Sequence, residues 1–104
     1  MMSAHALDGA VLKHWIAVRV GGRTHLLGVL IGGHPRLAPG RWVITSPVLA
    51  VNPATQIAVT ASTGRRYHLL DRLQPPLPAE AADLLAAAIG AWRLPPDTSV
   101  EFEL

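Results

Sequence analysis

Two consecutive glycines, Gly21 and Gly22, constrain the fold of this chain more than any other feature of its sequence. On either side of them, over residues 14–20 and 23–31, apolar residues recur with the two-residue period of a β-strand. A two-residue hairpin turn needs positive φ angles, which glycine adopts without steric cost. The pattern therefore predicts an antiparallel hairpin that closes at the two glycines.

A turn at this position also sets the register of the hairpin, because each strand residue then has one partner across the turn. The expected pairs are Val20 with Arg23, Val18 with His25 and Ile16 with Leu27. In the same register Trp15 lies opposite Gly28, where a large ring covers a residue that has no side chain.

Three further extended stretches follow at residues 41–51, 56–61 and 66–70, after a loop rich in glycine and proline. Tight turns separate them at residues 52–55 and 62–65. These stretches predict a three-stranded meander. Together with the hairpin it gives five antiparallel strands, which we expect to close into a small barrel or roll that leaves no free edge.

The composition changes after the meander. A proline-rich linker at residues 75–78 precedes a helix expected over residues 78–93, where apolar residues recur every three or four positions. That stripe consists of Ala81, Leu84, Leu85, Ala88, Ile89 and Trp92. Two prolines at 95 and 96 end the helix, and clean alternation over residues 99–104 predicts a sixth strand.

The predicted fold class is therefore α+β: a small antiparallel β-barrel or roll of five to six strands with one C-terminal α-helix packed on it. The 104 residues form a single domain. Its expected parts are a loose leader at 1–11, an antiparallel β body at 12–72, a helix at 78–93 and a final strand at 99–104.

Composition and the lack of long apolar stretches limit where the protein is expected to be found and which sites it can contain. The absence of cysteine excludes disulfides and thiolate metal sites. No signal peptide is recognisable and no apolar stretch is long enough to span a bilayer, so we expect a cytoplasmic protein with no membrane contact. Half of the residues are hydrophobic and only 15% are charged, and this apolar balance leaves a homodimer open.

No residue pattern predicts catalysis. The five histidines lack the spacing of a metal site, and no serine lies in a nucleophile motif. Neither glycine pair is followed by the Lys-Ser/Thr of a phosphate-binding loop. We therefore expect a non-enzymatic protein without catalytic residues, metal or cofactor.

Charge is distributed unevenly along the chain. Residues 1–72 carry eight basic and two acidic residues, whereas the remainder carries one basic and five acidic residues. A basic β body favours an acidic partner, and Trp and Arg dominate binding surfaces. The predicted binding residues are Arg36, Arg41, Trp42, Arg65, Arg66 and Tyr67. A protein partner is the first hypothesis; the alternative is a nucleic-acid-binding small β-barrel that uses the basic face of residues 13–72.

Three short motifs, HPR at 34–36, TSPV at 45–48 and TASTGRRYHL at 60–69, resemble a group of small bacterial proteins that share a TSPV…T-S-G-R-x-Y-x-L meander. This chain has one extra residue, Thr63, between the serine and the glycine, which lengthens that turn. The group is associated with plasmid and phage genes. The resemblance implies a mobile-element accessory protein or an inhibitor of a host complex, for example an anti-CRISPR-like inhibitor of a bacterial defence complex.

Overall fold

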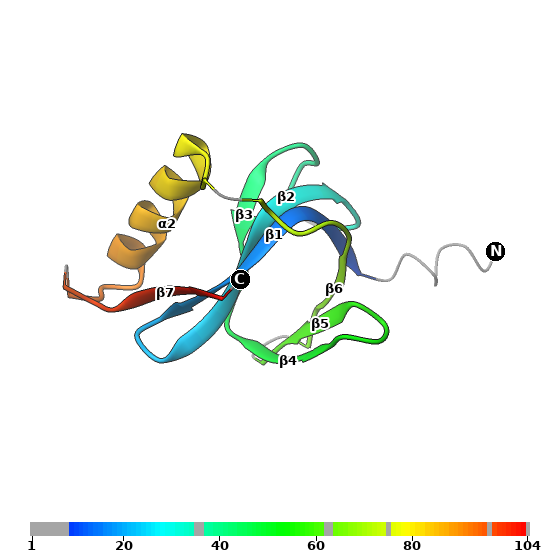
Figure 1. Cartoon of the computed structure of the whole chain (residues 1–104), viewed down its shortest axis with the longest axis horizontal. Helices are drawn as coiled ribbons and strands as arrows, with labels where there is room; N and C mark the ends of the chain where they lie inside the picture. The colour runs from blue at the N-terminus through cyan, green and yellow to red at the C-terminus, as the bar shows by residue number, and fades with distance from the viewer. Residues whose placement is uncertain (1–8, 35–36, 62–63, 75, 96, 104) are drawn as a thin grey trace.

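The structure is a computed structural model that describes residues 9–34, 37–61, 64–74, 76–95 and 97–103. These residues form a mostly β structure with one helix near the C-terminus (Figure 1). In chain order the elements are β1 (Ala10–Val20), β2 (Arg23–Gly32), β3 (Trp42–Ile44), β4 (Val48–Asn52), β5 (Ile57–Thr60), β6 (Arg66–Leu69), α2 (Ala79–Ala91) and β7 (Val100–Glu103).

The predicted hairpin is confirmed as β1 and β2. Gly21 and Gly22 form its turn with φ angles of 56° and 86°. The three predicted pairs all occur: Val20 with Arg23, Val18 with His25 and Ile16 with Leu27. Because strand β1 begins at Ala10, residues 10 and 11 belong to the sheet and not to the predicted leader, whose residues 1–8 lie outside the described part of the chain.

A bulge in β1 lies at the position predicted for the Trp15–Gly28 contact. Lys13 pairs with Val29 and Ile16 with Leu27, so two residues of β1, His14 and Trp15, face Gly28 alone. The extra residue reverses the alternation of β1, because side chains on a strand point to opposite faces in turn. Even-numbered residues therefore face one core cluster before the bulge and the other cluster after it.

The predicted three-stranded meander is confirmed as β4, β5 and β6, which pair in chain order and antiparallel, but its first stretch is shorter than predicted. Residues 41–51 do not form one strand: β3 pairs with β2, whereas β4 pairs with β5. The break falls at Pro47, which has no amide hydrogen to donate to a sheet. Two hydrogen bonds hold the corner against β2: Thr45 N donates to Leu26 O at 2.8 Å, and Leu26 N donates to Thr45 Oγ1 at 2.9 Å.

The sheet is mixed and open rather than an antiparallel closed barrel. Its strand order is β3-β2-β1-β6-β5-β4, with β7 on the free part of β1. Strands β1 and β6 run parallel, through Ala10–Leu12 of β1. The end strands β3 and β4 each have one paired neighbour in the described structure, so the ring that the sequence predicted is interrupted at the corner between them.

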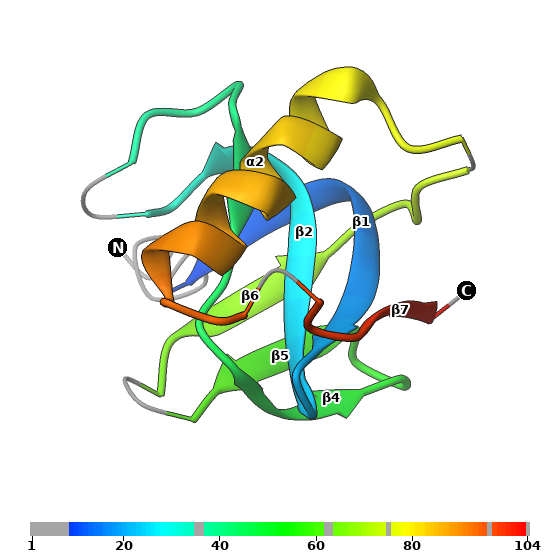
Figure 2. The ribbon, with the colours of Figure 1, turned by 90° about the vertical axis from the view of Figure 1, so that its left-hand side faces the viewer.

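The helix was predicted over 78–93 and extends over Ala79–Ala91, directly after Pro78. It packs over β2 and β3 (Figure 2), with Ala81, Leu85 and Ala88 buried as the stripe predicted. The sixth strand, predicted at 99–104, is seen as β7, which pairs antiparallel with the second half of β1. None of the helices described in the structure is long and apolar enough to cross a membrane.

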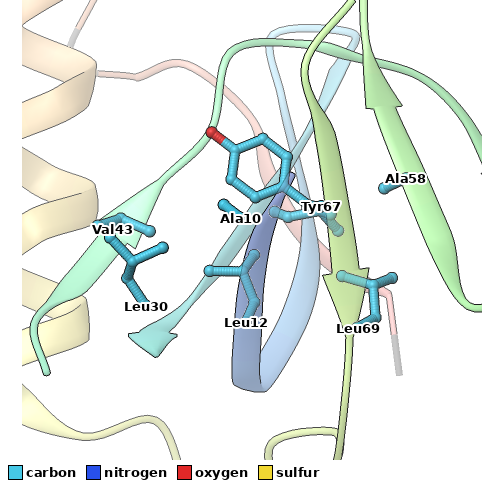
Figure 3. Close-up of a cluster of buried hydrophobic side chains, with 8 residues drawn as sticks. Ala10, Leu12, Leu30, Val43, Ala58, Tyr67 and Leu69 are labelled. Atoms are coloured by element: carbon cyan, nitrogen blue, oxygen red, sulfur yellow. The ribbon is translucent and has the colours of Figure 1, made fainter. Parts of the chain in front are cut away.

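Two hydrophobic clusters lie on opposite faces of the β1–β2 hairpin. The first lies between the hairpin and β5–β6 and is drawn in Figure 3; its buried members are Ala10, Leu12, Leu26, Leu30, Val43, Ala58, Tyr67 and Leu69. The second lies under α2 and contains Ile16, Val18, Val20, Leu27, Ala81 and Leu85. The hairpin is therefore the shared wall of both cores.

Candidate binding groove

The first part of the sequence-predicted site lies around the start of β3. Arg36 lies outside the described residues. Arg41 is exposed, and its carbonyl oxygen accepts a hydrogen bond from Leu30 N at 2.9 Å. Trp42 is half-buried and packs against the cluster under α2. Of the two residues that the structure describes here, Arg41 has the exposed side chain.

The second part of the predicted site lies at the start of β6. Arg66 is exposed on this strand, and Arg65 is half-buried, with its backbone N donating to Thr60 Oγ1 at 3.1 Å. Tyr67 is only 6% exposed, and its ring points into the first core cluster (Figure 3). Burial raises the pKa of the Tyr67 hydroxyl, an effect that the nearby charge of Arg65 opposes. The structure thus assigns the Tyr67 side chain to packing.

A different set of residues lines two adjoining hollows around the tip of the β1–β2 hairpin, of about 520 and 610 Å³. The hollows share Arg23 and Pro47, and we call them together the hairpin groove. The first lies between the hairpin and the end of α2 and is lined by Val20, Gly21, Arg23, His25, Pro47, Trp92 and Leu94. The second, toward β4, is lined by Arg19, Gly22, Arg23, Thr24, Pro47, Val48 and Ala61.

Both walls of the hairpin groove follow from features of the fold. The hairpin tip is held by Gly21 N, which donates to Ser99 O at 3.1 Å in the segment that leads into β7. In Figure 1 this tip lies at the lower left, below β7 and to the left of β4. The opposite wall is Pro47, at the corner that Thr45 attaches to β2. The proline that interrupts the sheet therefore also borders the groove.

A stacked ring pair forms one end of the hairpin groove. The rings of His25 and Trp92 lie 4.3 Å apart between centroids, with 20° between their planes. His25 is 3% exposed and Trp92 36% exposed, so the indole covers the imidazole. Nδ1 of His25 lies 2.8 Å from the carbonyl oxygen of Thr45. A carbonyl can only accept, so Nδ1 carries the hydrogen, and Nε2 is the acceptor when the ring is neutral.

The groove is cationic and apolar. No Asp or Glu occurs between Asp8 and Asp71, a stretch that contains all the residues of β1 to β6. Arg19 and Arg23 line the groove, and neither forms a salt bridge with any residue that the structure describes. Such a surface suits a ligand that combines negative charge with apolar groups.

A side-chain contact between His14 and Asp71 lies outside the groove, at the bulge of β1. His14 Nδ1 lies 2.6 Å from Asp71 Oδ2, and both side chains are about half exposed. Trp15 Nε1 donates to Leu70 O at 3.1 Å, and the Arg72 guanidinium lies 5.0 Å from the centre of the Trp15 ring. These contacts connect the bulge to the segment after β6. This structural role is sufficient to explain why His14 and Asp71 lie close together. Over the described ranges, no three His, Cys, Asp or Glu side chains gather closely enough to hold a metal ion.

The six predicted binding residues do not include Arg19, Arg23, His25 or Trp92, although both arginines belong to the basic face of residues 13–72 that the nucleic-acid alternative uses. One signal was available: the predicted hairpin register already placed His25 opposite Val18, close to the glycine turn and its two flanking arginines. Trp92 could not have been added, because its contact with His25 depends on how α2 packs on β2. Comparisons with protein-family models, with curated proteins and with solved structures find no significant match to this chain.

Proposed function

We propose that this chain is a non-enzymatic binding module that holds a short acidic segment of a partner protein in the hairpin groove. One observation supports this proposal above all others: Arg19 and Arg23 lie beside apolar groove walls with no salt-bridge partner in the described structure. Arginine donates five hydrogens in a planar arrangement that matches a carboxylate, and it is enriched at the centres of protein interfaces.

The surroundings of the groove favour a protein segment over a nucleic acid. Acidic residues flank it: Glu101 lies directly opposite Arg19 in the β1–β7 pairing, and Glu103 follows on the same strand. A long polyanion that left the groove in this direction would be repelled, whereas a short segment with a few carboxylates would not. The walls formed by Val20, Pro47 and Leu94 suit apolar side chains between those carboxylates.

A nucleic acid is the second candidate, because the His25–Trp92 ring pair lines the groove and exposed aromatic rings stack on unpaired bases. The same basic β body would then contact phosphates. In either case the setting that we propose is cytoplasmic. The role that the sequence resemblance implies is that of a mobile-element accessory protein, which would inhibit a host complex by occupying one of its acidic segments.

The proposal is tested by the binding of a fluorescein-labelled peptide of about eight residues in which Glu alternates with Leu, measured by fluorescence polarisation at low salt. A double variant, Arg19→Ala with Arg23→Ala, should weaken binding by about tenfold or more. The matched control is Arg41→Ala with Arg66→Ala, which removes the same charge from exposed positions outside the groove and should change affinity by less than about twofold.

Two further probes separate the candidates. A peptide with Lys in place of Glu should not bind, and a single-stranded oligonucleotide of about twelve nucleotides should bind more weakly than the acidic peptide. Tighter binding of the oligonucleotide would favour the nucleic-acid alternative. Loss of peptide binding in the Arg41/Arg66 variant alone would place the site at the sequence-predicted arginines and away from the groove. Thermal unfolding of each variant shows whether it is still folded.

A further inference from the structure

We infer that Arg23 and His25 form an anion subsite that gains a proton when it binds its ligand, so that the protonated imidazole and the guanidinium hold one ligand carboxylate together. This inference rests on the proposed function and adds to it a second ligand contact and a dependence on pH. It follows from the position of His25, from its tautomer and from the charges that face it.

The orientation of the His25 ring is set from two sides. Nδ1 donates to Thr45 O at 2.8 Å, and Trp92 stacks on the ring face with a centroid distance of 4.3 Å. Protonation changes neither contact, because Nδ1 already carries its hydrogen in the neutral ring and an indole face also attracts a cation. The ring is thus held in the same place in both charge states, and the change is confined to Nε2.

Nε2 is the atom that a ligand in the groove can reach. Every buried side-chain nitrogen or oxygen in the described part of the chain has a hydrogen-bond partner. Nε2 of His25 has no protein partner there, so it is not one of the buried atoms. His25 lines the first hollow, and the proposed subsite requires that Nε2 is the ring atom that faces it. In the neutral ring this atom repels a carboxylate, and in the protonated ring it donates a hydrogen bond to one.

The groups that face His25 in the protein are positively charged or uncharged. Arg23 lies two residues away on the same face of β2 and lines the same hollow. The other elements contribute uncharged neighbours: Val18 from β1, Thr45 from the corner and Trp92 from the end of α2. No carboxylate lines this hollow to balance an imidazolium. A ligand carboxylate supplies that balance, so ligand binding and proton binding favour each other.

The test measures the affinity of the same Glu–Leu peptide between about pH 5.5 and about pH 8, a range in which glutamate stays ionised and histidine titrates. Wild type should bind at least about fivefold more tightly at the acidic end. His25→Gln should lose this pH dependence while keeping binding that requires Arg23. The matched control, His68→Gln on β6, should behave like wild type.

A second measurement needs no variant. NMR titration of the histidine side chains in the wild-type protein should show that the midpoint for His25 rises when the peptide is bound, while the midpoint for His68 stays unchanged. Arg23-dependent binding with equal affinity at both ends of the pH range, or a pH dependence that survives in His25→Gln, would overturn this inference and leave the proposed function standing. An absence of peptide binding at every pH would overturn both.

Discussion

His14 shows how a single residue accommodates the bulge of β1. Its φ angle is 50°, in the left-handed region that residues with a Cβ seldom occupy. This backbone conformation is part of the bulge, in which two residues of β1 face Gly28 alone. The contact between His14 and Asp71 then holds the side chain on the side of the sheet where the chain returns after β6. Backbone strain and a favourable contact are therefore combined in the same residue.

Substitutions at His14 should separate backbone strain from the ion pair. His14→Val should lower the free energy of unfolding by about 1–2 kcal/mol, since a β-branched side chain is unfavourable at positive φ. His14→Asn should cost less than the valine variant, because asparagine tolerates this conformation although it loses the ion pair. Urea unfolding of both variants provides the comparison. Equal losses in the two variants would show that the ion pair, and not the backbone, determines the stability at this position.

Tyr67 allows a direct measurement of burial, because it is the only tyrosine in the chain. Burial raises the pKa of its hydroxyl above the ordinary value of about 10. The fold thus favours the neutral form, so the stability from this group is complete below pH 10 and is lost as the pH rises through the folded-state pKa. Ultraviolet titration of the tyrosinate should give a higher midpoint in the native protein than in urea. Tyr67→Phe should reduce the alkaline loss of stability; an identical loss in both proteins would contradict the buried position.

Among the secondary-structure elements, the hairpin allows the clearest test. A Cβ on Gly28 would lie 3.1 Å from Lys13 O and 3.2 Å from Trp15 Cα, and these are backbone atoms that cannot move aside without shifting β1. Gly28→Ala should therefore cost about 1–3 kcal/mol of unfolding free energy, as other overpacked sites do. Gly32→Ala is the matched control on the same strand, because nothing lies within 4 Å of its Cβ position. Chemical denaturation of both variants checks this, and a neutral Gly28→Ala would rule out the close packing of the bulge.

The helix carries a glycine that its fold does not require. Gly90 lies in the last turn of α2, and a Cβ there would meet nothing within 4 Å. Gly90→Ala should raise the unfolding free energy by about 0.5–1 kcal/mol, because alanine loses less backbone freedom on folding. Gly40→Ala provides the contrast: its Cβ position is equally open, but its φ angle is 89°. That variant should be destabilised, and differential scanning calorimetry should show shifts of opposite sign.

Local signals in the sequence were sufficient to predict most elements and the register of the hairpin, but not every pairing between strands. Two consecutive glycines located the hairpin turn, where both adopt positive φ. A three-to-four-residue period of apolar residues located α2 to within two residues at each end. The bulge at His14 could not be predicted, because it depends on contacts with Asp71 and Leu70, far along the chain. Tyr67 was assigned to the binding surface for a related reason: alternation shows that two faces differ but does not show which face is buried.

At the scale of the whole molecule, the parallel pairing of β1 and β6 follows from counting chain reversals. Residues 42–52 change partner at Pro47 but keep one direction: β3 is antiparallel to β2 and so has the direction of β1, and β4 has the direction of β6, which is parallel to β1. The chain therefore runs in five alternating directions, and the first and fifth must be parallel. A closed ring of five strands that alternate in direction must contain one parallel pair, where the first strand meets the fifth. The break in the sheet between β3 and β4 cannot be predicted in this way. Whether β4 also pairs with β2 depends on the packing around Thr45 and Pro47.

The separation of charge along the chain is not kept in space, because β7 brings acidic residues alongside the basic strand β1. Glu101 lies directly opposite Arg19, which also lines the hairpin groove. A carboxylate in this position has two effects of opposite sign: it stabilises the sheet as a cross-strand partner, and it partly neutralises an arginine that we propose binds the ligand.

Glu101→Gln should therefore lower the free energy of unfolding and strengthen ligand binding at the same time. The expected cost is about 0.2–1 kcal/mol, the range for cross-strand charge pairs. The acidic peptide should bind about two- to fivefold more tightly at low salt, and the difference should vanish at about 0.5 M KCl, where the Debye length is only a few ångströms. Glu80→Gln on α2 removes the same charge from an exposed position that does not line the groove, and it should leave affinity unchanged. Equal gains in the two variants would mean that net charge alone governs binding, and they would remove the support for a site at Arg19.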